Sequence, residues 1–565
     1  MSRARVGLAV LLAALVAVPA ARAAPPANLT EERAVGILLA EDGVRAWVAR
    51  YPAESLVTEA EYSTEHRDWT VKAWSGDAGQ IVLGRVDDLT GVVEDAWTGP
   101  QVAWPMARGG GHVFGGKRLN SLPVWLGFCA VFFLGLADLR RLRSVRNLDL
   151  VVLISLSVSL WFFNDGRIFT SVPLVYPVLL YLLGRMLWIG VRPRPSRPSR
   201  PLWPVWLLAA ATIFLAGFRI GLDLSGAAVI DVGYSGVIGA HRIANGQAPY
   251  GHFPQATGRP CGPEDRNGRA VLRIQTNGRC EKQNEHGDTY GPVAYEAYLP
   301  GYAFFGWKGD NDPLHAAHFT SIAFDLACIL GLVLVGLRYG DRRLAATLAF
   351  AWAAYPFTQY VASTSSNDAI QPALLIFGFW LAASPWGRGS FAALASWTKF
   401  APIVVAPLWA TYPERRLRPT AFFFAAFAAA TLAAFWVLLL EPDPAGAVRT
   451  VWDRAIGHQL GRESPFSLWD WRQYHAGLPD LHLVQRALQV LLLVAAIALA
   501  FVPRRKSPLQ LAALTAALLI GFEVVLTHWF YLYVAWFFPF VAFAVLAPET
   551  DEGGSHGEPP SLAGG

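Results

Sequence analysis

The feature that most constrains this chain is a series of apolar stretches, several of them about 18 to 23 residues long. A helix of that length crosses the hydrocarbon core of a bilayer, which is about 30 Å thick. Only 16% of the residues are charged, whereas soluble domains carry about 25%. The 22 Trp and 33 Phe residues suit the aromatic belts of membrane interfaces. The sequence therefore excludes a water-soluble enzyme and predicts an all-α multi-pass membrane protein.

Residues 1–24 have the pattern of a secretory signal peptide. Arg3 and Arg5 precede an apolar stretch from Val6 to Val18, and small residues follow up to Ala24. An uncleaved anchor helix is the alternative. Both interpretations place the next segment outside the cytoplasm.

Residues 29–108 are polar and of mixed pattern, and predict a small extracytoplasmic α+β domain. Leu29 to Tyr51 has helical spacing, whereas Trp69 to Trp74 and Gln80 to Val86 alternate as strands do. The stretch VDDLTGVVEDAWTG resembles PepSY-like modules. That resemblance implies a binding or inhibitory role and a protein partner; a packed domain without chemistry is the alternative.

Basic clusters predict how the remaining chain crosses the membrane. Residues 121–192 form a three-helix membrane extension, and residues 202–548 form a larger membrane module. Loops rich in Arg stay in the cytoplasm, which leaves the loops 221–314 and 441–480 outside. About eleven crossings result, followed by a disordered cytoplasmic tail at 549–565. The predicted location is the plasma (inner) membrane, with a cytoplasmic C-terminus.

Residues 391–410 are long enough to cross, but a crossing there would put Arg415 and the later basic clusters outside. A re-entrant hairpin returns them to the cytoplasm. Pro402, three residues after Lys399, removes a backbone donor and disfavours helix at the preceding residue. We expect re-entry, with a spanning helix as the alternative.

Two of the four cysteines, Cys261 and Cys280, lie about twenty residues apart in the first exterior loop. An oxidising compartment favours a disulfide between them, and two free thiols are the alternative. Two cysteines alone are too few for a zinc site.

Four segments, in order, carry a family resemblance: IDVGYSGVIGAHRIANGQAPYG, DTYGPVAYEAYLP, STSSNDAIQPALLIFGFW and ASWTKFAPIVVAPLW. Together they resemble the polyprenol-phosphate-mannose-dependent mannosyltransferases of glycosyltransferase family 87, within the GT-C superfamily. The likeness spans about residues 202–546. It implies inverting transfer of a sugar, foremost mannose, from a polyprenyl-phosphate donor to an envelope glycan or glycolipid at the exterior membrane face.

The resemblance also implies site residues. Asp231 is the expected general base and Asp223 its reserve, although Asp231 could equally cap a helix. Cationic and imidazole groups would serve the donor phosphate or sugar: His241, Arg242, Lys399, His458 and Arg462. Asp288 and Tyr290 are the expected acceptor contacts. No metal and no cofactor are expected, because a lipid monophosphate can leave with help from cations alone.

Other functions remain open at this stage. A polyprenyl-phosphate-arabinose-dependent arabinofuranosyltransferase is the nearest alternative. A lipid or solute transporter would need broken helices at equivalent places in two halves, and the sequence has one such break. A non-catalytic envelope scaffold would not depend on Asp231. The expected partners are the lipid-linked donor, the acceptor and the bilayer, and no nucleic acid.

Overall fold

The computed structural model describes residues 27–64, 67–75, 80–98, 102, 115–116, 118–164, 167–192, 203–226, 229–253, 287–308, 314–460, 462, 464, 466–473 and 479–547. The chain divides into a small N-terminal unit that ends at Val102 and a larger helical unit. Each unit is described by itself. The predicted signal peptide, the predicted tail at 549–565 and the pair Cys261 and Cys280 lie outside the described residues.

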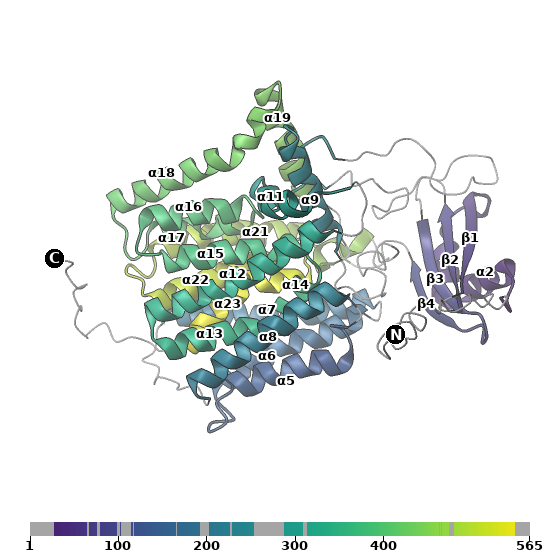
Figure 1. Ribbon diagram of the computed structural model, residues 1–565, viewed down its shortest axis with the longest axis horizontal. Helices are drawn as coiled ribbons and strands as arrows, with labels where there is room; N and C mark the ends of the chain where they lie inside the picture. Colours follow the sequence, from purple (N-terminus) through teal and green to yellow (C-terminus); the bar gives the residue numbers. More distant parts are fainter. Residues whose placement is uncertain are drawn as a thin grey trace, which may run out of the picture. The chain divides into compact units, whose positions relative to one another are not determined.

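The N-terminal unit packs helices on an antiparallel sheet (Figure 1). Its elements are α2 (Glu31–Ala40), α3 (Asp42–Val48), the 3-10 turn η1 (Ala53–Ser55), and strands β1 (Leu56–Ser63), β2 (Asp68–Ser75), β3 (Gln80–Asp87) and β4 (Val93–Thr98), ordered β1-β2-β3-β4. The Thr30 side chain caps α2 by accepting from the Arg33 N–H. The small helix-and-sheet domain is thus confirmed, whereas its exported location and its PepSY likeness stay predictions.

Within the quoted motif of this unit, Asp88 is a packing residue. Its carboxylate is 1% exposed and accepts from the backbone N–H groups of Asn28 and Leu29, both at 2.9 Å, and from Trp69 Nε1 at 3.0 Å. The acid therefore fastens the start of the domain to strand β2 and is withdrawn from solvent.

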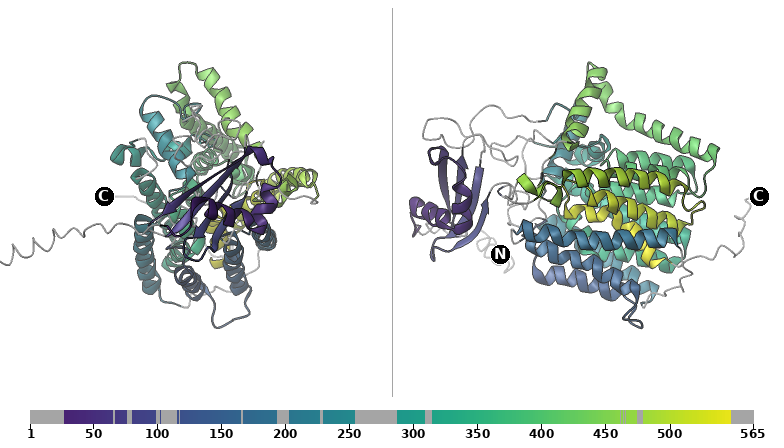
Figure 2. Two further views of the ribbon diagram at one scale, coloured as in Figure 1. Left: turned by 90° about the vertical axis from the view of Figure 1, so that its right-hand side faces the viewer. Right: turned by 180° about the vertical axis from the view of Figure 1, so that it is seen from behind.

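The larger unit is helical, and its helices lie side by side in the views of Figures 1 and 2. The elements up to the first exterior loop are α5 (Leu122–Leu136), α6 (Val145–Asn164), α7 (Ile168–Val191), α8 (Val205–Gly226) and α9 (Asp231–Ala244). The elements from there to the hairpin are α10 (Val293–Glu296), α11 (Leu299–Phe305), α12 (His315–Tyr339), α13 (Arg342–Ala354), α14 (Pro356–Ser363), η5 (Asn367–Ala369) and α15 (Ile370–Trp380).

The remaining elements lead to the C-terminal helix. They are α16 (Pro385–Ser396), η6 (Ala401–Val405), α17 (Ala406–Ala410), α18 (Leu417–Ala434), η7 (Phe435–Leu440), α19 (Pro444–Val451), η8 (Trp452–Gly457), α20 (His458–Leu460), η9 (Leu468–Gln473), α21 (His482–Phe501), α22 (Pro508–Val524), η10 (Tyr531–Tyr533) and α23 (Val534–Leu546). Proline is the first residue of α16, α19 and α22, which suits the first helical turn, where no backbone donor is needed.

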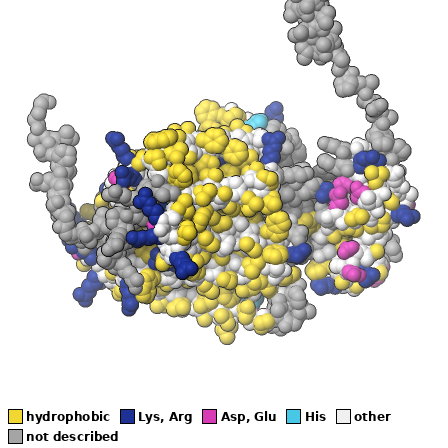
Figure 3. Space-filling view, turned by 90° about the horizontal axis from the view of Figure 1, so that it is seen from below, with side chains coloured by type: hydrophobic (Ala, Val, Ile, Leu, Met, Phe, Trp, Pro, Cys, Tyr) yellow, Lys and Arg dark blue, Asp and Glu magenta, His cyan; other side chains and the backbone are white. Residues whose placement is uncertain are grey.

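Six helices of the described residues are long and apolar enough to cross a membrane: α6, most of α7, α8, α12, α18 with η7, and α21. Four shorter apolar segments accompany them: α5, η6 with α17, α22, and η10 with α23. Figure 3 shows a broad band of apolar side chains over this unit, with Lys and Arg gathered along its edge. The membrane character is confirmed, and the number of about eleven crossings stays a prediction.

The basic loops meet at one end of the helical unit. Lys506 donates its backbone N–H to the Pro413 carbonyl at 2.7 Å, and Gln510 Nε2 reaches the Gly190 carbonyl at 2.9 Å. Trp203 Nε1 likewise donates to the Leu134 carbonyl at 2.8 Å. We call this the basic end. The opposite end carries the junction of α8 with α9, and we call it the site end.

The segment from α16 to α17 is a hairpin. The buried Arg388 guanidinium, near its start, donates to the carbonyls of Trp409 at 2.8 Å and Tyr412 at 2.7 Å, near its finish. The two arms therefore run in opposite directions, and the break between them places Lys399 at the tip. This is the geometry that the re-entrant interpretation predicts.

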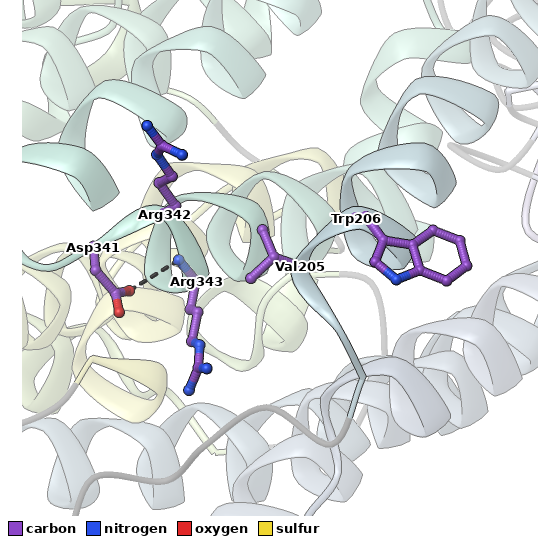
Figure 4. Close-up of a pocket in the computed structure, with 5 residues that line it drawn as sticks. All are labelled: Val205, Trp206, Asp341, Arg342 and Arg343. Atoms are coloured by element: carbon purple, nitrogen blue, oxygen red, sulfur yellow. Dashed lines mark hydrogen bonds between the residues drawn. The ribbon is translucent and has the colours of Figure 1, made fainter.

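An open depression of about 610 Å³ lies at the basic end. It is lined by Val205, Trp206, Asp341, Arg342 and Arg343 (Figure 4). Asp341 is already engaged there, because its carboxylate accepts the Arg343 N–H at 2.9 Å and so caps α13. The 22 residues of α8 separate this depression from the site end by about 30 Å.

Candidate active site

Asp231 is the first residue of α9 at the site end. The preceding Ile230 is extended, and its N–H donates to the Thr364 carbonyl at 3.2 Å, which fixes where the helix begins. Gly233 faces the next carbonyl, that of Ser365, so closely that a side chain on residue 233 would collide with it. The start of α9 is thus held against the turn between α14 and η5, whereas the Asp231 side chain remains exposed to solvent.

The charges around Asp231 come from three other segments. Although the side chain has a solvent-accessible surface, the protein groups around it partly desolvate the carboxylate and raise its pKa; the positive charges of Arg462 and Lys399 oppose that shift, as does the Val232 N–H. Asp368 adds a like charge that raises the pKa further. Asp231 therefore holds its proton more tightly than an ordinary carboxyl does, yet two cations favour its ionised form. That combination suits a group that must accept a proton near neutral pH.

Lys399 reaches the site from the hairpin tip. Its Nζ lies 2.6 Å from Asp368 Oδ1, and both side chains are buried. The rings of Tyr290, Tyr533 and Trp536 surround the ammonium group, with centroids 5.1, 5.3 and 5.5 Å away. The sequence singled out Lys399 but not Asp368 as its partner, because the two lie 31 residues apart and no local pattern links them.

Arg462 comes from the second exterior loop and is held by His528. The Arg462 guanidinium lies 3.2 Å from His528 Nε2, and Ser464 Oγ lies 2.9 Å from His528 Nδ1. Because a guanidinium can only donate, Nε2 accepts and Nδ1–H donates to Ser464. Burial lowers the pKa of His528 well below its ordinary range, and the charges of Arg462, Lys399 and His458 act in the same direction. His528 is therefore neutral and orients Arg462.

The electric field of Arg462 reaches several groups at the site end. Its positive charge opposes the rise in the pKa of Asp231 and also acts on the hydroxyl groups of Tyr290 and Tyr533. We therefore treat Asp231, Lys399 and Arg462 as one candidate site, to which α9, the hairpin tip and the second exterior loop contribute. His458, at the start of α20, acts on His528 and lies at the border of that site.

The family model that matches this chain is that of glycosyltransferase family 87, over residues 289–528. The chain carries a family 87 glycosyltransferase module. The matched range contains Tyr290, Asp368, Lys399, Arg462 and His528, and it begins after Asp231. No curated protein matches the chain. The GT-C type of membrane glycosyltransferase inferred from the four sequence segments is thereby confirmed.

His241 and Arg242, which precede the matched family 87 range, do not lie beside Asp231. Both lie at the far end of α9, about 15 Å along the helix axis from its first residue. His241 Nδ1 lies 2.9 Å from the Tyr302 hydroxyl, and burial, with the nearby Arg242 charge, lowers the pKa of His241. Arg242 donates to Gln247 at 3.2 Å. The spacing along α9 separates this pair from Asp231, and its predicted contact with the donor stays a prediction.

Asp288 has structural partners, and its predicted acceptor role stays a prediction. Its carboxylate is fully buried. Both of its oxygens accept from Arg454 Nε, at 3.0 and 2.8 Å, and Oδ2 also accepts the Gly251 N–H at 2.8 Å. It ties the two exterior loops together and has no free face for an acceptor. Tyr290, in contrast, lies at the site beside Lys399.

Asp223, the reserve base, is buried, and one of its two carboxylate oxygens, Oδ2, has no hydrogen-bond partner among the described residues. It is 1% exposed, and its Oδ1 lies 3.4 Å from His318 Nδ1 and 3.3 Å from Ser365 Oγ. These contacts anchor the turn against which α9 begins. Asp231 is the more accessible of the two carboxylates, and the choice between them as base stays a prediction.

Two further charged groups, Asp325 and Glu523, lie in apolar helices and have structural partners. Asp325 pairs with Arg219 and accepts Trp352 Nε1 at 2.8 Å, and Glu523 accepts Trp529 Nε1 at 3.0 Å. Among the described residues, no group of three or more His, Cys, Asp or Glu side chains could hold a metal ion. The expectation of metal-independent chemistry stays a prediction.

Proposed function

We propose that the family 87 module transfers a sugar, with mannose as the first choice, from a polyprenyl-phosphate donor to an envelope glycan or glycolipid. A polyprenyl-phosphate-arabinose donor is the nearest alternative. The observation that carries the proposal is the convergence of one solvent-accessible carboxylate, Asp231, with the cations of Arg462 and Lys399 at the site end. A carboxylate beside two cations suits this transfer, because the carboxylate can take the proton of the acceptor hydroxyl and a cation can stabilise the negative charge of the leaving phosphate.

In the proposed reaction, the acceptor hydroxyl donates its proton to the Asp231 carboxylate as its oxygen attacks the anomeric carbon of the donor sugar. The bond between that carbon and the phosphate oxygen breaks, and the electron pair leaves with the polyprenyl phosphate. Attack opposite to the leaving group inverts the anomeric configuration. Asp231 then holds the proton, and the product lipid phosphate carries the negative charge.

Arg462 is the group best suited to that developing phosphate charge. Guanidinium binds phosphate oxygens through paired N–H donors, and His528 fixes its orientation before the donor arrives. Lys399 is bound to Asp368 and enclosed by aromatic rings. We propose that Lys399 contributes positive charge and helps to fix the shape of the site, and that Arg462 contacts the donor directly.

The location of the reaction follows from the same topology. The basic clusters meet at the end opposite to Asp231, and basic loops remain cytoplasmic. The proposed site therefore faces the exterior of the plasma (inner) membrane, where the lipid-linked donor and the acceptor would enter from the bilayer. The N-terminal domain would then face the same side and could receive a protein partner.

The test uses membranes that contain the full chain and a radiolabelled polyprenyl-phosphate-mannose. Label should move into a glycan or glycolipid fraction with the wild type and not with Asp231→Asn. A parallel assay with a polyprenyl-phosphate-arabinose donor distinguishes the two sugars. If neither donor transfers label in the presence of cell-envelope acceptors, the proposed donor class is wrong.

A further inference from the structure

We propose that the three-helix extension α5–α7 supports the transfer site, because it contacts and positions the loop that carries Arg462. The extension precedes the range matched by the family model. The inference rests on the proposed role of Arg462 toward the donor phosphate. It assigns Tyr176 of α7 as a positioning residue that acts through that loop.

The first contact is a hydrogen bond between the extension and the loop backbone. The Tyr176 hydroxyl accepts the Leu468 N–H at 3.2 Å, at the first residue of η9. Its ring also meets the indole of Trp469 edge-on, with centroids 6.3 Å apart. Trp469 Nε1 in turn donates to the Val524 carbonyl at 2.8 Å. The loop is therefore pinned between α7 on one side and the end of α22 on the other.

A second path runs through aromatic rings. Phe163, at the end of α6, lies 5.9 Å from Phe466 and 5.3 Å from Phe530, centroid to centroid. Phe466 lies 5.3 Å from the imidazole of His528, which holds Arg462. A further edge-to-face contact joins Phe169 of α7 to Trp471, with centroids 5.1 Å apart. The loop thus contacts the extension at several positions.

The chain between these contacts and Arg462 is short and internally braced. The Ser464 N–H donates to Asp470 Oδ2 at 2.7 Å, which closes the turn that includes Leu468. The Ser464 hydroxyl bonds the same His528 ring that receives Arg462. A shift of residues 468–470 would therefore move Ser464, and with it the imidazole that orients the guanidinium.

The extension is itself fixed to the core beside this loop. Ser159 and Ser171, from α6 and α7, both bond the hydroxyl of Tyr531, at 2.6 and 3.1 Å. Tyr531 is buried and lies three residues after His528 in the chain. Both the loop and the His528 segment consequently use the extension as their support. We infer that the extension sets how tightly the site holds a phosphate.

The experiment is a double-mutant cycle on the purified full chain, with a fluorescent polyprenyl monophosphate as the probe. Tyr176→Phe keeps the ring against Trp469 and removes the hydroxyl that accepts the Leu468 N–H and that also interacts with the neighbouring Ser467 side chain in the same loop. One lost hydrogen bond corresponds to about a five-fold increase in Kd. Arg462→Ala should raise Kd by about 10-fold or more, because a charged partner is lost. In the Arg462→Ala background, Tyr176→Phe should add nothing.

Tyr181→Phe is the matched control. Tyr181 lies on the same helix, is half-buried like Tyr176, and donates its hydroxyl to Asp149 at 2.8 Å, away from the loop. Arg185 still pairs with Asp149 in that variant, so Kd should not change. Thermal unfolding of each variant shows whether it is folded.

Each outcome decides the inference. A Tyr176→Phe variant with wild-type Kd, or one that weakens binding equally with and without Arg462, contradicts it. If the Tyr176 and Tyr181 substitutions raised Kd equally, the extension would only stabilise the protein in general, and the inference would also be contradicted. If Arg462→Ala binds the probe as the wild type does, the proposed donor role of Arg462 fails and the inference fails with it, whereas the assignment of Asp231 is tested separately by label transfer.

Discussion

Lys399 Nζ lies 2.6 Å from Asp368 Oδ1, inside a cage of aromatic rings at the tip of a hairpin. Trp536 Nε1 donates to the same carboxylate oxygen at 3.1 Å. A buried ion pair is costly to desolvate and becomes most costly when one partner is removed. The pair therefore shapes the site end and at the same time makes the hairpin tip sensitive to single substitutions.

Asp368→Asn should destabilise the protein by about 3–5 kcal/mol, because it leaves the Lys399 ammonium buried without its counter-charge. The double variant Asp368→Asn with Lys399→Met should regain most of that stability, since it removes both charges. Thermal unfolding in detergent measures both effects. A single variant as stable as the wild type would show that the pair is not important for folding.

Asp231→Asn should abolish transfer while the protein still folds. The residue is exposed at the start of α9, so its side chain contributes little to packing. Loss of a general base typically lowers kcat by about 10²- to 10⁴-fold. Gly233→Ala should also lower activity, but through collision with the Ser365 carbonyl, and it should lower the melting temperature as well. If Asp231→Asn retained more than about a tenth of kcat, a different base would be required.

The pH dependence of transfer follows from the raised pKa of Asp231. Burial among protein groups is the main cause of that shift. The base must be ionised, so the rate should fall as the pH is lowered through a value above the ordinary carboxyl range. Burial also raises the pKa of Glu296 to about 7, and Glu296→Gln is therefore the control. The acid limb of kcat/KM should persist in Glu296→Gln; its disappearance would assign the limb to Glu296.

His528→Phe should lower the catalytic efficiency with the lipid-linked donor, because it leaves Arg462 without the hydrogen-bond acceptor that orients it. We expect kcat/KM for the donor to fall by about tenfold, as for a lost charged hydrogen bond. His528→Gln keeps an acceptor and a donor, and should be affected less. His528 has a depressed pKa in the fold, so its stabilising contribution is present above about pH 6.5 and is lost as the pH falls below that value. The His528→Gln variant should consequently melt with a weaker dependence on acid, and equal acid sensitivity would contradict this role.

Asp288→Asn should act on the exterior loops and not on the chemistry. It removes the counter-charge of Arg454 and weakens the bond to Gly251, at a cost of about 1.5–3 kcal/mol. The KM for the acceptor should change no more than the KM for the donor. A selective rise in the acceptor KM would restore the acceptor role predicted from the sequence.

Much of the fold was predictable because membrane insertion leaves strong local signals. The apolar stretches predicted the helices, and the basic clusters together with Pro402 predicted the hairpin whose ends Arg388 joins. The base and the hairpin lysine were found because each lies within a recognisable segment. The family resemblance suggested their roles, and the effect of the Lys399 charge on Asp231 favours one candidate site for the two residues.

The rest of the site depends on contacts between distant segments. His241 and Arg242 follow Asp231 closely in sequence, but three turns of helix carry them away from it. The bonds of Asp288 with Arg454 and of Lys399 with Asp368 join residues that are 166 and 31 positions apart. His528 orients Arg462 from 66 positions away. Such pairings depend on how the loops fold over the helices, and no local periodicity encodes them.

The most direct test of the central claim is transfer of radiolabel from polyprenyl-phosphate-mannose in membranes that contain equal amounts of wild type, Asp231→Asn and Asp223→Asn. We predict transfer by the wild type, none by Asp231→Asn, and residual transfer by Asp223→Asn in proportion to the folded protein. Equal transfer by the wild type and Asp231→Asn would contradict the account.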